Sequence, residues 1–318
     1  MSIAHYIKEI GRGGEGARAL TAEQACDLMS QVLDGRVTDL EIGAFALAMR
    51  MKGETVEELS GFLEAAHERC LPLPVQRPVV LLPSYNGARR LPNLTALLAL
   101  RLAQEGAQVL VHGPTHDPAR VTTAEIFRDL GLNATRTAHE VEQAWSRHEP
   151  AFMRTDVICP PLARLLDVRW VVGLRNSGHT IAKMLNPCRG ARGLRIVNHT
   201  HPEFGALMAA YAQRDHADML LLRGTEGEPV ADPRRAPRLQ VSLDGQPRGD
   251  LSSLAQEGVL TELPVLPRSH DAATTALYIQ SVLSGEKPTP GPLEQQVQVI
   301  VRTLHAMDHD ANSLGLTA

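Results

Sequence analysis

The feature that most constrains the fold is an alternation of short apolar runs with helical stretches in the part of the chain beyond residue 78. The runs VVLLP, QVLVHG, LRIVNH, DMLLLRG and LQVSL have the length of buried strands, and helical patterns at Asn93–Gln104 and Pro202–Ala212 stand between them. Parallel strands need long crossover connections, which are usually helices. The alternation therefore predicts an α/β domain over residues 75–318, with a mainly parallel central sheet.

The beginning of the chain predicts a small helical domain. Thr21, Thr38 and Thr55 each stand three residues before a Gln or Glu, which is the capping-box signature of a helix start. The proline-bearing segment CLPLPVQRP cannot continue a helix and ends this region. We place the helical domain at residues 1–74 and expect helices within residues 155–187 to join it.

Composition limits the classes of function. A net charge of −4 gives no global attraction to nucleic acid, so any basic binding surface has to be local. Aromatic residues make up only 3% of the chain, which excludes an extended platform for stacking bases. The four cysteines are widely separated, and no apolar run approaches the ~20 residues of a membrane span. We expect a cytoplasmic protein without a membrane partner.

From end to end, the chain resembles the anthranilate phosphoribosyltransferases, which share their architecture with the pyrimidine nucleoside phosphorylases. The stretch DLMSQVLDGRVTDLEIGAFALAMRMKGETVEELSGF resembles the helical N-terminus of that family, and VVGLRNSGHTIAKMLNP aligns without gaps on its LGIRTIFNLLGPLLNP segment. The resemblance implies a small helical domain, a larger α/β domain and a homodimer formed through the helical domain.

The substrate-binding motifs depart from that family. Its GTGGD loop wraps the pyrophosphate of phosphoribosyl pyrophosphate, whereas the same position here reads PSYNG. The segment that carries an adjacent Asp-Glu metal-binding pair in the family here offers only Glu226 and Glu228. The resemblance therefore implies a degenerate cleft. Its residual residues are Tyr85, Asn86, Asn93, Thr95, His112, Gly113 and Glu228.

Three segments, SYNGARR, VHGPTHDPAR and RGTEGEPVA, resemble the YbiB-type branch of the family, whose members are associated with nucleic-acid binding. The residues supply a basis for such binding, because residues 168–202 contain six basic side chains and no acidic one. Arg238 follows the run MLLLRG together with two further arginines. The candidate phosphate-binding residues are Arg89, Arg90, Arg169, Arg175, Lys183, Arg189, Arg192, Arg195, Arg234 and Arg235.

The leading hypothesis is a nucleic-acid-binding protein on a phosphoribosyltransferase-like scaffold, which holds DNA or RNA without sequence preference and needs no cofactor. The alternative is a glycosyl- or phosphoribosyltransferase for an acceptor other than anthranilate, which would use Mg²⁺ with phosphoribosyl pyrophosphate. A third hypothesis is a sensor that binds a nucleotide in the cleft. The arginines also have the ordinary alternative of being solvated or paired with acids. No catalytic residue is assigned, and the histidines lack the spacing of a metal site.

Overall fold

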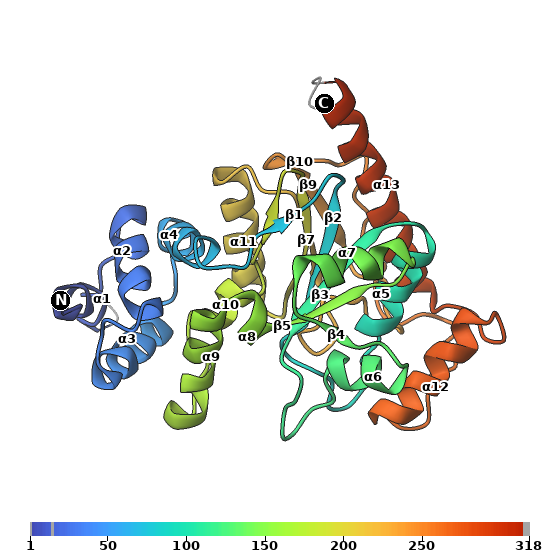
Figure 1. The fold of residues 1–318 in the computed structure, drawn as a ribbon, viewed down its shortest axis with the longest axis horizontal. Helices are drawn as coiled ribbons and strands as arrows, with labels where there is room; N and C mark the ends of the chain where they lie inside the picture. The colour runs from blue at the N-terminus through green and yellow to red at the C-terminus, as the bar shows by residue number, and fades with distance from the viewer. Residues whose placement is uncertain (1, 14–15, 314–318) are drawn as a thin grey trace. The chain divides into compact units, whose positions relative to one another are not determined.

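The computed structural model describes residues 2–13 and 16–313 of the chain, which forms two compact units. The helical unit comprises Met1–Leu71 and Thr155–Pro187. The α/β unit comprises Pro72–Arg154 and Cys188–Ala318. Each unit is thus built from two separate segments of the chain (Figure 1).

The helical unit begins its longer helices where the sequence places capping boxes. Thr21, Thr38 and Thr55 each accept the backbone N–H of the third helical residue, whose side chain accepts the backbone N–H of the threonine in return. These three predicted helix starts are confirmed. The helices are α1 (Ala4–Ile10), α2 (Ala22–Leu33), α3 (Asp39–Lys52), α4 (Val56–His67), α8 (Thr155–Ile158), α9 (Pro160–Val172) and α10 (Gly178–Ala182).

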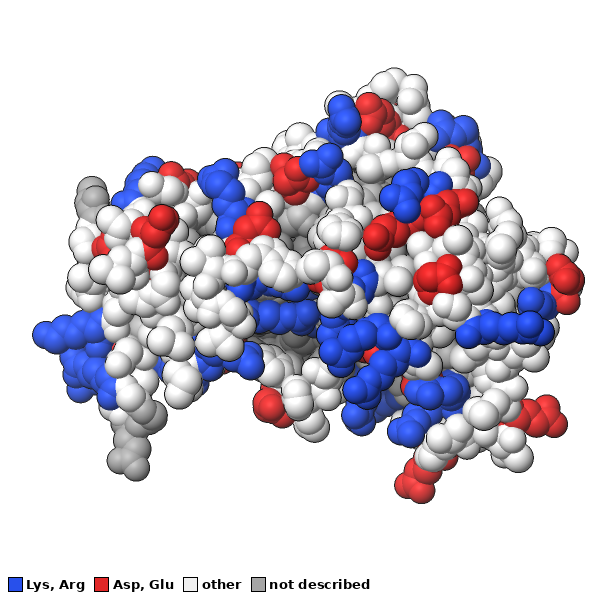
Figure 2. All heavy atoms as spheres, turned by 90° about the horizontal axis from the view of Figure 1, so that it is seen from below, with Lys and Arg blue, Asp and Glu red and all other residues white. Residues whose placement is uncertain are grey.

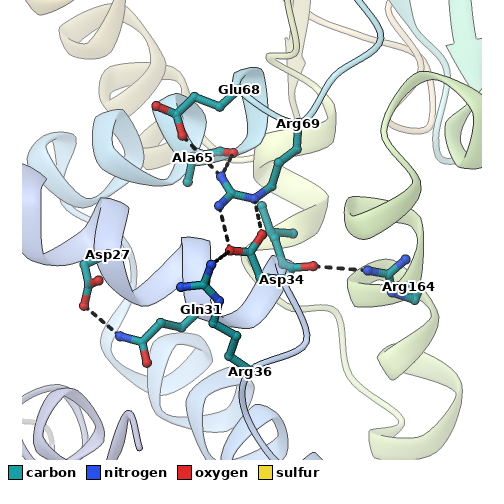
Figure 3. Close-up of polar contacts among 9 residues, drawn as sticks. Asp27, Gln31, Asp34, Arg36, Ala65, Glu68, Arg69 and Arg164 are labelled. Atoms are coloured by element: carbon teal, nitrogen blue, oxygen red, sulfur yellow. Dashed lines mark hydrogen bonds and ion pairs between the residues drawn. The ribbon is translucent and has the colours of Figure 1, made fainter. Parts of the chain in front are cut away.

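Polar contacts tie the later segment of the helical unit to the earlier one (Figure 3). Arg69, just beyond α4, donates to both carboxylate oxygens of Asp34 at the end of α2, at 2.7 and 3.1 Å. The same guanidinium donates to the carbonyl of Ala65 at 2.7 Å. Arg164 of α9 donates to the carbonyl of Leu33 at 3.1 Å, so the ends of α2 and α4 are fixed beside α9.

The α/β unit contains an eight-stranded sheet in the order β10-β9-β8-β7-β2-β3-β5-β4. All neighbours from β8 to β4 run parallel, and β9 and β10 form an antiparallel edge, which confirms the predicted mainly parallel sheet. A separate two-stranded sheet joins β1 and β6. The strands are β1 (Leu73–Pro74), β2 (Val79–Pro83), β3 (Gln108–Gly113), β4 (Ala134–Thr135), β5 (Ala151–Arg154), β6 (Cys188–Arg189), β7 (Gly193–His199), β8 (Met219–Arg223), β9 (Leu239–Leu243) and β10 (Gln246–Pro247).

Helices cover the sheet because its strands are apolar on both faces. Val80 and Leu82 of β2 pack in one cluster with residues of α5, α12 and α13. Since side chains alternate along a strand, Val79 and Leu81 face the opposite side. Figure 1 shows α11 across the sheet from α5 and α13. The helices of this unit are α5 (Thr95–Gln104), α6 (Thr123–Asp129), α7 (Ala138–Ser146), α11 (Pro202–Arg214), α12 (Ala272–Leu283) and α13 (Gly291–Ser313).

The strand order places a switch point beside β2. The chain passes from β2 to β3 on one side, and later adds β7 on the other side of β2. In open α/β sheets, ligands bind in the crevice outside the carboxyl ends of the strands at such a point. The segment Ser84–Pro92, called the reworked loop below, follows β2 and lies at this edge. Within the described residues, no helix is long and apolar enough to cross a membrane.

Candidate functional site

The backbone N–H groups at the start of the reworked loop are bound by a carboxylate of the protein itself. Glu228 is buried, and one of its oxygens accepts the N–H of Asn86 at 2.8 Å and that of Gly87 at 2.7 Å. The other oxygen accepts the hydroxyl of Thr95 at 3.1 Å and the hydroxyl of Ser84 at closer range. Four donors therefore converge on a single internal anion.

A second carboxylate binds the later part of the reworked loop. One oxygen of Glu226 accepts the backbone N–H groups of Arg89 at 2.7 Å, Arg90 at 3.0 Å and Leu91 at 3.3 Å. Burial alone would raise the pKa of Glu226, but these backbone hydrogen bonds, together with the charge of Arg120, bring it below its usual value. Glu226 is therefore held as an anion at neutral pH.

Both glutamates belong to a tight turn that interlocks with the reworked loop. The N–H of Glu228 donates to the carbonyl of Thr225 at 2.9 Å, and Glu226 and Gly227 have φ values of 51° and 88°. The side-chain amide of Asn86 donates to the carbonyl of Glu226 at 3.1 Å. A Cβ atom on Gly227 would lie 1.5 Å from that amide nitrogen, so only glycine fits there.

The strand-end residues of the residual cleft are packed rather than open. His112 has no exposed surface, and its Nδ1 lies 2.9 Å from the hydroxyl of Tyr85. Burial lowers the pKa of His112 to about 3, so the ring is neutral. Its Nε2 atom has no hydrogen-bond partner among the described residues. A Cβ on Gly113 would lie 1.9 Å from the carbonyl oxygen of Ser84, so the two chain segments are in close contact.

Asn93 and Thr95 organise the start of α5. The side-chain oxygen of Asn93 accepts the N–H of Thr95 at 3.1 Å, and its amide donates to the hydroxyl of Thr123 at 3.0 Å. The Thr95 hydroxyl donates a hydrogen bond to the carboxylate of Glu228. All seven residual-cleft residues thus lie in the α/β unit, where Glu228 binds Asn86 and Thr95 and the hydroxyl of Tyr85 contacts His112. While Glu226 and Glu228 stay in place, an external diphosphate cannot accept hydrogen bonds from the backbone N–H groups of the reworked loop.

Beside the turn, the α/β unit contains a pocket of about 1030 Å³, called the arginine pocket below. Its charged lining consists of five arginines and two carboxylates, a formal balance of +3. One arginine, Arg234, is paired with Asp232 at 2.9 Å. The other four have no ion pair with any residue that the structure describes. The arginines are Arg90, Arg223, Arg234, Arg235 and Arg238, and the carboxylates are Glu226 and Asp232.

Sequence reasoning missed Arg223 and the role of Glu226. Arg223 is the last residue of β8, and His199, its partner in register, is the last residue of β7. Because carboxyl ends of adjacent parallel strands meet at one edge, the position of Arg223 at the end of the run MLLLR was a usable signal. The attachment of Glu226 to the reworked loop had no local signal, because more than 130 residues separate the two.

Three of the predicted basic residues gather in the helical unit. His179 there is buried, and its pKa falls to about 3 because of burial and of the nearby charges of Arg175, Arg169 and Lys183. Arg169 also lies over the ring of Trp170, 4.0 Å from its centroid. These cations therefore form a local basic cluster of their own.

Three other candidates of the α/β unit lie away from the arginine pocket's lining. Arg192 precedes β7 and forms an ion pair with Asp218, which precedes β8, so both lie at the amino ends of those strands. Arg195 is buried within β7. Arg189 lies in the small β6 strand, where it donates to the carbonyl of Cys188 at 2.9 Å. None of these three arginines lines the arginine pocket.

Basic and acidic side chains are both present on one face of the molecule (Figure 2). Lys and Arg side chains gather in patches on the face drawn in Figure 2, with acidic side chains between and beside them. The local excess of positive charge in the arginine pocket therefore coexists with an overall charge of −4. Over residues 2–13 and 16–313, no three His, Cys, Asp or Glu side chains are grouped to hold a metal ion.

Comparison with known proteins agrees with this architecture. Residues 4–70 match the glycosyl transferase family, helical bundle domain. The structure of anthranilate phosphoribosyltransferase from Thermus thermophilus superposes with a TM-score of 0.68 at 22% identity, over 93% of this chain and 87% of that one. The yeast enzyme in complex with PRPP and Mg, from Saccharomyces cerevisiae, gives a TM-score of 0.69 at 13% identity, over 97% and 89%. The chain thus has an anthranilate phosphoribosyltransferase-like glycosyltransferase fold.

A closer relative is found by sequence. The uncharacterized protein YbiB of Escherichia coli (strain K12) is 38% identical over 300 residues, which cover 93% of this chain and 92% of that protein. By comparison, the anthranilate phosphoribosyltransferase of Nocardioides sp. is 24% identical over 268 residues, covering 84% and 78%. The chain belongs to the YbiB family within this superfamily.

Proposed function

We propose that the chain binds nucleic acid without sequence preference through the arginines around its arginine pocket. The observation that carries this proposal is the presence of Arg90, Arg223, Arg235 and Arg238 in one pocket, where none of them forms an ion pair with a described residue. Unpaired guanidinium groups are available to neutralise backbone phosphates and release counterions. The exposed Arg89, next to Arg90 in the reworked loop, extends the same site.

The binding mode follows from what the pocket lacks. No Phe, Tyr or Trp is among the described residues that line it, so successive bases have no stacking platform there. Arginine contacts to phosphate position a strand but carry no sequence information. DNA and RNA are both suitable partners, because the proposed contacts involve only the phosphates. The affinity is expected to fall steeply with salt.

The occupied loop weighs against the transferase alternative. In that alternative, the reworked loop would wrap the diphosphate of phosphoribosyl pyrophosphate through its N–H groups. Glu226 and Glu228 already accept five of these N–H groups. Two carboxylates in this position also repel an incoming diphosphate. Nucleic-acid binding requires no opening of the loop and is therefore the function that the geometry supports better.

We also propose that the helical unit forms a homodimer interface. Leu40 and Met51 of α3 are 83% and 79% exposed, although α3 buries Phe45 on another side. Val171 of α9 is 89% exposed, beside the half-exposed Trp170. Helices that are apolar on two sides commonly cover the second side with another subunit. Light scattering coupled to size exclusion tests this: Leu40→Asp with Met51→Asp is expected to yield monomers, and a wild-type monomer would refute the proposal.

Fluorescence anisotropy with a 5′-hydroxyl single-stranded oligonucleotide tests the proposed function at about 50 and about 200 mM salt. Arg235→Ala combined with Arg238→Ala is expected to weaken binding and to reduce the salt slope by about 0.7 for each phosphate that is no longer neutralised. The matched control is Arg128→Ala with Arg136→Ala, which removes two exposed arginines of the same unit outside the pocket. Absence of binding at low salt would refute the proposal.

A further inference from the structure

The arginine pocket lies where an open sheet places a small ligand. His199 and Arg223, the last residues of β7 and β8, both line it. So do Arg90 and Leu91 of the reworked loop, which follows β2. Three neighbouring parallel strands thus contribute their carboxyl ends, and the switch point lies between β2 and β7. This is the expected position of a ligand site rather than of a flat binding surface.

The charge of the pocket matches a phosphomonoester better than a backbone phosphodiester. A phosphodiester carries one negative charge, whereas a phosphomonoester carries about −1.5 to −2 at pH 7 and offers three terminal oxygens. The guanidinium fork binds two such oxygens at once. With five arginines against two carboxylates, the pocket has a formal surplus of +3. A phosphomonoester neutralises more of that surplus than one phosphodiester does.

The shape of the pocket leaves room for more than the phosphate. Its volume of about 1030 Å³ lies at the upper end of the ~300–1,000 Å³ usual for small-molecule sites. Ala206 and Ala209 of α11, together with Leu221, form an apolar part of the wall. A Cβ on Gly205 would lie 3.2 Å from the ring of His199, so this ring rests on the first turn of α11. A sugar and a base fit beside such a wall.

The start of α11 adds to the attraction for an anion. Pro202 is in the first turn and lines the pocket, and no side chain caps the helix there. Backbone N–H groups and the helix dipole at the start of a 13-residue helix favour negative charge, and Glu203, the acidic residue of this first turn, is not among the residues that line the pocket. Together with the arginines and the cavity, this feature supports the same ligand chemistry.

We infer that the arginine pocket is a phosphomonoester-binding site, which takes a nucleoside 5′-monophosphate or the 5′-terminal phosphate of a strand. The shared chemistry is a dianionic phosphate on a nucleoside. Two sources offer this group: a nucleoside 5′-monophosphate, called the free-nucleotide source, and the 5′-terminal phosphate of a strand, called the strand-end source. Only the strand-end source rests on the proposed nucleic-acid binding. The affinity comes mainly from the phosphate rather than from the base, because no Phe, Tyr or Trp among the described residues lines the pocket to select a base.

Isothermal titration calorimetry of the full chain with adenosine 5′-monophosphate and with adenosine tests the free-nucleotide source. The monophosphate is expected to bind, and adenosine is not. Binding of the monophosphate should weaken by more than about tenfold in Arg235→Ala with Arg238→Ala, because charge-assisted hydrogen bonds are lost. The control Arg128→Ala with Arg136→Ala should bind as the wild type does. Arg223→Gln gives a second pocket variant in case the double variant does not fold.

A pair of oligonucleotides of one sequence, with and without a 5′-phosphate, tests the strand-end source by anisotropy. A preference of about tenfold for the phosphorylated strand, abolished by the pocket variants, supports the inference. If the monophosphate does not bind and the two strands bind equally, the inference is overturned while the proposed function stands. If the monophosphate binds and the hydroxyl strand does not bind at low salt, the inference stands and the proposed function fails.

Discussion

Removal of the Glu228 carboxylate should destabilise the α/β unit strongly. In Glu228→Ala, the N–H groups of Asn86 and Gly87 lose their acceptor in a buried position. Each unsatisfied buried donor costs about 1–3 kcal/mol, so the two together cost about 2–6 kcal/mol. The hydroxyls of Ser84 and Thr95 add less, because Ser84 retains Thr123 as a partner at 2.7 Å. The expected loss is a large share of the ~5–15 kcal/mol that stabilises an ordinary protein.

Thermal unfolding followed by circular dichroism measures this loss. For a unit of this size, 1 kcal/mol corresponds to about 2–4 °C, so a loss of about 2–6 kcal/mol should lower Tm by roughly 4–24 °C. The matched control is Glu262→Ala, which removes an exposed carboxylate of the same unit and should leave Tm unchanged. A fall of less than about 3 °C for Glu228→Ala would refute the role assigned to its four hydrogen bonds.

A small anion should partly rescue the variant if the vacated N–H groups form an anion site. Formate fills the position of the missing carboxylate, and a ligand at a hundredfold its Kd stabilises a protein by about 2.7 kcal/mol. Formate should therefore raise the Tm of Glu228→Ala well above any effect on the wild type. An equal rise in both proteins would show that the N–H groups do not form such a site.

Three further predictions concern other parts of the chain. His112 and His179 have folded pKa values of about 3, below the ordinary 6.5, so the unfolded state takes up protons first as pH falls. The free energy of unfolding should therefore be highest above pH 6.5 and should decline between pH 6.5 and 3. At pH 5, urea titrations should show a loss of about 2 kcal/mol for each histidine. A free energy of unfolding that stays constant from pH 7.5 to 5 would contradict this. Gly227→Ala should cost at least about 2 kcal/mol, measured the same way, and less in an Asn86→Ala background that removes the clashing amide. Asp34→Ala should lower stability by about 1 kcal/mol and leave oligonucleotide binding unchanged, because it breaks the ion pair with Arg69 inside the helical unit, whereas the proposed site belongs to the α/β unit.

Several elements of the fold followed from local patterns. Each of Thr21, Thr38 and Thr55 specifies a helix start through contacts within three residues, so the signal lies entirely within a short window. The short apolar runs likewise predict buried strands, and β2 and β3 coincide with VVLLP and QVLVHG. The replacement of the family's glycine loop by PSYNG was also visible in the sequence.

The candidate site depended on long-range contacts that no local pattern encodes. Glu228 reaches Asn86 across 142 residues of chain, and its neighbour Glu226 reaches Arg89 across 137. The run of basic residues from 168 to 202 was one basis for the predicted nucleic-acid binding, yet Arg169 belongs to the helical unit and Arg192 to the amino end of β7. Proximity in sequence was therefore a poor guide to which cations share a site.

The sequence by itself determined three helix starts, the strands that coincide with its apolar runs, the mainly parallel sheet, and the loss of the phosphate loop of the wider superfamily. Only the tertiary structure decided that two glutamates occupy the reworked loop and that Arg90, Arg223, Arg235 and Arg238 line one pocket. The physical reason is that helix caps and strand patterns are short-range properties of the chain. The partner of a buried donor or of a cation instead depends on which distant segments the strand order brings together.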